Sequence, residues 1–310
     1  MSCTLIVNPF ATTSSGWSRE LIVRSVKAMF QTEVYVTNER SHAITIAREA
    51  RKRESKYIIV LGGDGTVNEV INGLLDETVL EYEQPILAVI PGGLANVFTR
   101  SLGFSADAIS ATGEILESLE QHQTRKISLG TFNDRWFSFN AGIGLDAGIL
   151  SAMEALRAEG RKASPGGYLI TGLKHYFDDT LQYPPNIHLE NDRAETIEDA
   201  AMVIIQNAAP WSYVGPLSLD FATEASFDHG LDAVALTELS PSSIAAYLAE
   251  AAARIPTERR SKLSWLHDCN EIQISATRPY PAHVDGDSIG DVTFVRVVHH
   301  KDALNVAIPS

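Results

Sequence analysis

The chain has 310 residues, 45% of them hydrophobic, and a formal net charge of −14. This length can bury a sizeable core and predicts two domains. The acidic excess disfavours a nucleic-acid-binding role, because neutralising phosphates requires a basic face. It also disfavours adsorption to anionic membranes through net charge alone. We therefore expect no nucleic-acid partner.

The two cysteines, Cys3 and Cys269, lie far apart and lack metal-ligand spacing, which predicts a reduced, cytoplasmic protein. The apolar run at the N-terminus is too short for a signal peptide, and no stretch approaches about 18 uninterrupted apolar residues. We expect a soluble protein that meets any lipid from the water side, as a peripheral membrane protein.

The first half of the sequence alternates between short apolar runs and helical patterns. Strands are predicted at 4–7, 33–37, 57–60 and 85–90, and helices at about 17–30, 41–53, 67–75 and 106–121. Ser41 is a suitable N-cap for the second helix. This order predicts parallel β-α units, which place ligands at the carboxyl ends of the strands.

Gly62, Gly63 and Gly65 surround Asp64 between the strand at 57–60 and the helix that follows. Glycine has no Cβ to obstruct a ligand, and a helix N-terminus presents backbone N–H groups to an anion. The pattern predicts a phosphate-binding loop, with a plain tight turn as the alternative. Because a carboxylate repels phosphate, Asp64 would order the loop, hold a cation or meet a hydroxyl. The motif is neither a Walker loop nor a Rossmann fingerprint.

From about residue 128 the sequence pattern changes to short apolar runs separated by turns, with helical patterns only at 147–156, 167–177 and 242–254. The predicted fold class is α/β plus β. Residues 1–127 form an N-terminal parallel α/β nucleotide-binding domain, and 128–310 form a C-terminal antiparallel β-rich sandwich whose last strand can return to the first domain. We interpret the mixed basic and apolar stretch at 154–176 as a solvated helix face, with membrane contact as the alternative.

The string GGDGTVNEV at 62–70 resembles the signature of the diacylglycerol kinase catalytic-domain family, which includes sphingosine, ceramide and bacterial lipid kinases. GGDGT alone also occurs in NAD kinases, which share the fold superfamily. The segment PGGLANVFTR at 91–100 resembles the family's second signature. It departs from that signature at Leu94, where a hydroxyl residue is usual, and at Val97, where many members have Asp. One lost hydrogen bond at Leu94 would weaken ATP binding by up to about tenfold.

The resemblance implies a nucleotide site built from the two glycine loops and the ends of the first strands. Its members are Asn8, Thr37, Gly62, Gly63, Asp64, Gly65, Thr66, Asn68, Gly93, Leu94, Asn96 and Arg100. Arg100 would face phosphate charge, and a helix-end salt bridge is its alternative.

Three segments of the second half resemble the family's lipid and metal sites. WFSFNAGIGLD at 136–146 implies that Asp146 binds the lipid head-group hydroxyl, with a helix N-cap as the alternative. SFDHGLD at 226–232 implies Asp228 and Asp232 as ligands of Mg²⁺, a cation that prefers oxygen ligands. VDGD at 284–287 stands in place of the family's Asp-Gly-Glu and implies Asp287 as catalytic base, with Asp285 as the second candidate. A hairpin turn is the alternative there.

Together these inferences predict an ATP- and Mg²⁺-dependent lipid kinase that phosphorylates a lipid hydroxyl, such as that of diacylglycerol, at the membrane surface. Asp64, Asp285 and Asp287 are the expected catalytic acids, and a homodimer is compatible with the sequence. An NAD kinase-like enzyme is one alternative, disfavoured by Asn68-Glu69 and the later Asp-Gly-Asp. The other is a degenerate nucleotide- or lipid-binding regulator without turnover. The departures from the family pattern at Leu94, Val97 and His229 would favour it.

Overall fold

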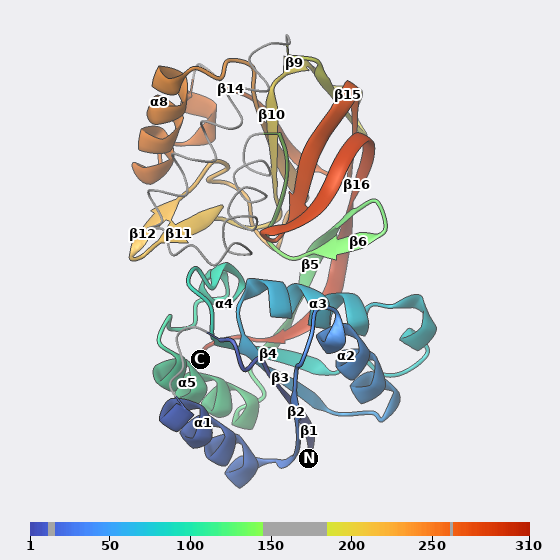
Figure 1. Cartoon of the computed structure of the whole chain (residues 1–310), viewed down its shortest axis with the longest axis vertical. Helices are drawn as coiled ribbons and strands as arrows, with labels where there is room; N and C mark the ends of the chain where they lie inside the picture. Colours follow the sequence, from blue (N-terminus) through green and yellow to red (C-terminus); the bar gives the residue numbers. More distant parts are fainter. Residues whose placement is uncertain (12–15, 145–184, 261–262) are drawn as a thin grey trace. The chain divides into compact units, whose positions relative to one another are not determined.

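The computed structural model describes residues 1–11, 16–144, 185–260 and 263–310, and the chain divides into two compact units (Figure 1). Unit 1 comprises Met1–Leu129, Ser212–Leu217 and Lys301–Ser310, and unit 2 comprises Gly130–Trp211 and Ser218–His300. No sequence pattern indicated that 212–217 belongs with the first unit. The expected lipid ligand Asp146, the stretch at 154–176 and the helices expected at 147–156 and 167–177 lie outside the described residues.

A parallel sheet forms the centre of unit 1, with strand order β2-β1-β3-β4 followed by the end of β16. All six residues of β3 are buried, which explains its unbroken apolar sequence. The strands are β1 Ser2–Val7, β2 Gln31–Val36, β3 Tyr57–Gly62, β4 Ile86–Pro91 and β16 Asp287–Ala307, whose first part lies in unit 2.

Helices cover both faces of this sheet, with α1 beside α5 and α2 beside α3 (Figure 1). The fold class predicted for this half is confirmed. The helices are α1 Gly16–Met29, α2 His42–Lys52, α3 Asp64–Leu74, η1 Glu77–Val79, α4 Val97–Ser101 and α5 Ala108–Glu120.

The prediction that Ser41 caps α2 is wrong. Ser41 adopts a left-handed backbone conformation, with φ of 64°, and its side chain makes no capping hydrogen bond. The carboxylate of Glu69, in α3, caps α2 instead by accepting hydrogen bonds from the backbone N–H groups of Ser41 (2.8 Å) and Ala43 (3.2 Å). A carboxylate at this end also suits the helix dipole.

Antiparallel strands make up most of unit 2, as the sequence predicted. Strand β15 pairs with β7, β8 and β16, and β10 lies between β7 and β13, which in turn pairs with β14. The pair β5–β6 and the pair β8–β9 complete this arrangement. The strands not yet named are β5 Thr124–Phe132, β6 Arg135–Phe137, β7 Asn140–Ile143, β8 Ile187–Asn191, β9 Thr196–Ala200, β10 Met202–Gln206, β11 Ser212–Val214, β12 Leu217–Leu219, β13 Leu231–Leu236, β14 Leu263–Cys269 and β15 Glu271–Val284.

Two apolar clusters form the core of unit 2. The larger packs alternate residues of β7, β8, β10 and β13–β16 together, and the smaller includes Ile244, Tyr247 and Ala251 of the helix α8 Pro241–Ala252. A short helix, η2 Thr257–Arg259, follows. Cys3 and Cys269 are buried free thiols. No helix in the described part of the chain is long and apolar enough to cross a bilayer.

Candidate nucleotide and catalytic sites

The two glycine loops of unit 1 lie against each other at the carboxyl ends of the neighbouring strands β3 and β4. The backbone N–H of Gly92 donates to the carbonyl of Gly62 at 2.8 Å. A Cβ on Gly63 would lie 3.1 Å from the Cα of Gly93, and one on Gly93 would lie 2.9 Å from the Cα of Gly63. Any side chain at either position would push the loops apart. The glycines therefore serve the packing of the loops as well as access to the backbone.

The side chain of Asp64 joins the first glycine loop to the helix that follows the second. Its Oδ2 accepts from the N–H of Val97 at 3.1 Å and its Oδ1 from the N–H of Phe98 at 3.2 Å, both in the first turn of α4. In the structure Asp64 orders the loop, and a role toward a cation or a hydroxyl stays a prediction.

Asn96 holds the second glycine loop closed. Its backbone is left-handed, with φ of 49°, and the residue is 4% exposed. The side-chain amide donates to the carbonyl of Gly93 and accepts from its N–H, each at 2.7 Å. Asn96 thus acts on loop shape, and a direct nucleotide contact by this side chain stays a prediction.

The helix α3 begins at Asp64, directly after the first glycine loop. The first N–H groups of an α-helix have no acceptor within the helix, and the helix dipole places partial positive charge at that end. The loop and first turn can therefore bind an anion such as a phosphate group.

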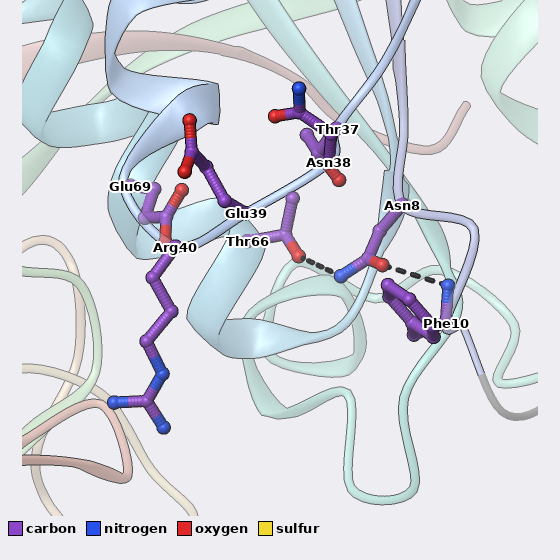
Figure 2. Close-up of a pocket in the computed structure, with 8 residues that line it drawn as sticks. All are labelled: Asn8, Phe10, Thr37, Asn38, Glu39, Arg40, Thr66 and Glu69. Carbon is purple, nitrogen blue, oxygen red and sulfur yellow. Dashed lines mark hydrogen bonds between the residues drawn. The ribbon is translucent and has the colours of Figure 1, made fainter.

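A pocket of about 240 Å³ adjoins this helix start, lined by Asn8, Phe10, Thr37, Asn38, Glu39, Arg40, Thr66 and Glu69 (Figure 2). The side chain of Asn8 donates to Thr66 Oγ1 at 2.8 Å and accepts from the N–H of Phe10 at 2.9 Å. The structure thus brings together three predicted nucleotide contacts, Asn8, Thr37 and Thr66. The pocket is smaller than the roughly 300–1,000 Å³ of drug-sized ligand sites, so it suits part of a ligand.

Three other predicted nucleotide contacts do not line this pocket. Asn68 is fully buried and accepts two hydrogen bonds from the side chain of Asn72. Leu94 is 75% exposed. The guanidinium carbon of Arg100 lies 3.2 Å from the centroid of the Tyr213 ring, and its Nη1 donates to the carbonyl of Gly215 at 3.2 Å. A phosphate contact by Arg100 would therefore compete with these bonds.

The Asp-Gly turn of unit 2 gives its two acids different surroundings. Asp285 and Gly286 have φ of 46° and 84°, and Val284 pairs with Asp287, so the hairpin-turn interpretation holds. Asp285 is 3% exposed. Its Oδ2 accepts from the N–H and Oγ of Ser138 at 2.7 and 2.9 Å, and its Oδ1 from the N–H groups of Phe139 and Asn140 at 3.0 and 3.2 Å. Asp285 therefore fixes the turn to the segment before β7.

Asp287, two residues later, is accessible. Its side chain is 33% exposed and pairs with the Nη2 of Arg135 at 3.1 Å. An alcohol could approach this carboxylate, whereas the four donors around Asp285 occupy both of its oxygens. The geometry favours Asp287 over Asp285 as the proton acceptor.

The two predicted metal ligands lie in different surroundings. Asp228 is exposed in a turn, whereas Asp232 is fully buried in β13. Oδ1 of Asp232 bonds His267 Nδ1 at 2.8 Å and the N–H of Asp268 at 3.0 Å, while Oδ2 has no hydrogen-bond partner in the described ranges. Burial raises the pKa of Asp232, and the bonds from Asp268 and His267 oppose that shift. Within those ranges, no three His, Cys, Asp or Glu side chains are grouped to hold one metal ion.

Comparison with known proteins shows what the first unit is similar to. Residues 2–132 match the family model described as the diacylglycerol kinase catalytic domain. Among curated proteins, the diacylglycerol kinase of Staphylococcus haemolyticus is 33% identical over 118 residues, which cover 38% of this chain and 33% of the relative. That of Staphylococcus aureus (strain MRSA252) is 34% identical over 136 residues, covering 43% and 40%. The matches thus span well under half of each relative.

The likeness in fold extends beyond residues 2–132. A solved diacylglycerol kinase structure from Bacillus anthracis superposes with a TM-score of 0.72 and 22% identity, covering 99% of this chain and 96% of that one. At this identity the similarity establishes the fold alone. Both units therefore have the architecture seen in that structure.

Sequence reasoning missed several residues of the pocket in unit 1. Glu69 was used only to argue against an NAD kinase, and Phe10, Asn38, Glu39 and Arg40 were not assigned a role. The aromatic residue directly after Asn8-Pro9 was a usable signal, because large apolar side chains are usually buried. The capping role of Glu69 has no local signal, since its partners lie 26 and 28 residues away.

Proposed function

We propose that the protein is an ATP- and Mg²⁺-dependent lipid kinase that transfers the γ-phosphoryl group to a lipid hydroxyl, such as that of diacylglycerol. The observation that carries this proposal is the close contact of the glycine loops, held by Asp64 beside the first turn of α3. A triphosphate would lie on these loops, and its nucleoside would enter the pocket of Asn8, Thr37 and Thr66. The activity named for the curated relatives supports it.

Asp287 is the proposed general base. It would take the proton of the lipid hydroxyl as that oxygen attacks the γ-phosphorus and the bond to the β-phosphate oxygen breaks. General-base catalysis typically contributes about 10²- to 10⁴-fold, and positioning and charge neutralisation supply much of the rest in phosphoryl transfer. Asp285 would position this turn, and Asp64 the phosphate-binding loops.

Of the two predicted ligands, Asp232 fits Mg²⁺ better, because its buried Oδ2 has no hydrogen-bond partner among the described residues. Asp228, in the exposed turn, is its proposed companion. Mg²⁺ usually keeps several waters and needs only one or two carboxylates with substrate phosphates, so a larger protein cage is unnecessary. When bound, the ion would supply positive charge for phosphate groups.

The lipid partner would be reached at a membrane surface, with the protein bound peripherally. The test is transfer of labelled phosphate from ATP with Mg²⁺ to mixed micelles that contain diacylglycerol. Wild type should yield labelled lipid. Asp287→Asn should lower kcat by about 10²- to 10⁴-fold. The matched control is Asp291→Asn, an exposed acid on the same strand, which should behave like wild type. Equal activity of all three proteins would refute the assignment of Asp287.

A further inference from the structure

Phe10 is an aromatic residue at the mouth of the proposed nucleoside pocket. It is 80% exposed, the most exposed of the large apolar residues described, although such side chains are usually buried. Single exposed apolar side chains are common and need no explanation alone. Phe10 differs because it lines a pocket beside a helix N-terminus (Figure 2).

The position of Phe10 is linked to the phosphate-binding helix through one side chain. Asn8 accepts from the N–H of Phe10 at 2.9 Å and donates to Thr66 in the first turns of α3 at 2.8 Å. The backbone of Asn8 donates to the carbonyl of Leu61, just before the glycine loop, at 2.9 Å. These bonds hold the backbone of Phe10 beside the glycine loop and the start of α3.

The remaining walls of the pocket are polar. Thr37, Asn38, Glu39 and Arg40 follow the end of β2, and they offer hydroxyl, amide, carboxylate and guanidinium groups. A pocket that combines an apolar ring with polar groups suits a flat heteroaromatic ligand with polar edges better than an acyl chain, which offers those groups no hydrogen bonds.

We propose that Phe10 is the surface on which the nucleotide base stacks, while residues 37–40 contact the base edge and the ribose. The inference rests on the proposed function and adds a residue that determines binding of the base. Stacking is available to every base, so Phe10 would contribute affinity without strong discrimination between adenine and guanine.

The test measures nucleotide binding without lipid, by titration calorimetry with ATP and Mg²⁺ and, separately, with inorganic tripolyphosphate. Phe10→Ala should weaken ATP binding by about 5- to 150-fold. It should leave tripolyphosphate binding unchanged, because that ligand has no base. Phe10→Trp should restore ATP binding. The matched control is Phe294→Ala, which removes a ring that is 56% exposed on β16; ATP should bind it as it binds wild type.

A fluorescent analogue, 2-aminopurine riboside triphosphate, gives a direct readout of stacking. Its emission should fall when it binds wild type and should not fall with Phe10→Ala at saturating protein. Equal ATP affinity of wild type and Phe10→Ala would overturn the role of Phe10 and leave the kinase proposal intact. Parallel losses of ATP and tripolyphosphate binding would also overturn it, because Phe10 would then only shape the loop. If wild type bound neither ligand, the nucleotide site of the proposed function would itself be refuted.

Discussion

Replacing Asp285 by Asn should destabilise unit 2 strongly, even though the two side chains have almost the same shape. The carboxylate is 3% exposed and accepts four hydrogen bonds from residues 138–140. The substitution turns one oxygen into an NH₂ group that faces two donors. Each buried donor left without an acceptor costs about 1–3 kcal/mol, so the free energy of unfolding should fall by about 2–6 kcal/mol. That is a large share of the roughly 5–15 kcal/mol of a typical protein.

Asp287→Asn is the matched comparison, two residues away. Its exposed ion pair with Arg135 is worth only about 0.2–1 kcal/mol, so stability should barely change while kcat falls. Urea unfolding followed by the fluorescence of Trp136, Trp211 and Trp265, all in unit 2, measures both variants. A loss below about 0.5 kcal/mol in Asp285→Asn, or a larger loss in Asp287→Asn than in Asp285→Asn, would refute the division of roles.

Three further substitutions test other parts of the account. Asp64→Asn removes an acceptor from the first turn of α4. It should lower the free energy of unfolding by about 1–3 kcal/mol and lower turnover by orders of magnitude. Wild-type activity in a kinase assay would contradict this. Leu94→Thr, at a 75% exposed site, should lower the KM for ATP by about 2- to 10-fold if a hydroxyl there meets the nucleotide, and an unchanged KM would show that it does not. Burial raises the pKa of Asp220, which is fully buried, to about 6. The native state therefore binds more protons than the unfolded state between about pH 4 and 6, and the stability that protonated Asp220 contributes is lost as the pH rises through about 6. Asp220→Asn should raise the free energy of unfolding at pH 7–8 by about 1–3 kcal/mol and flatten its pH dependence. The exposed control Asp228→Asn should do neither. Urea unfolding measured at several pH values from 4 to 8 tests both expectations.

The elements of unit 1 could be predicted because their signals are local. Apolar runs such as 57–60, followed at once by glycines and a helical pattern, identify a strand, a loop and a helix within about 20 residues. The close contact of Gly63 with Gly93 was not predictable from either loop alone, since it depends on β3 and β4 lying side by side.

Roles that depend on distant partners were not predictable in the same way. Ser41 has the residue type of an N-cap, yet Glu69 performs that role from another helix. Asp285 and Asp287 look alike in the sequence, and only the positions of Ser138, Phe139 and Asn140 show that the first is enclosed by donors. Motifs of a few residues thus indicated candidate site residues, whereas the contacts of each acid required the folded chain.

The central claim is that this chain transfers phosphate to a lipid hydroxyl. The most direct test incubates the full chain with γ-labelled ATP, Mg²⁺ and a micellar panel of diacylglycerol, monoacylglycerol, ceramide, sphingosine and phosphatidylglycerol, with NAD alongside. The account predicts labelled lipid with wild type and its loss with Asp287→Asn. Labelled NADP with no labelled lipid, or ATP binding without any labelled acceptor, would contradict it.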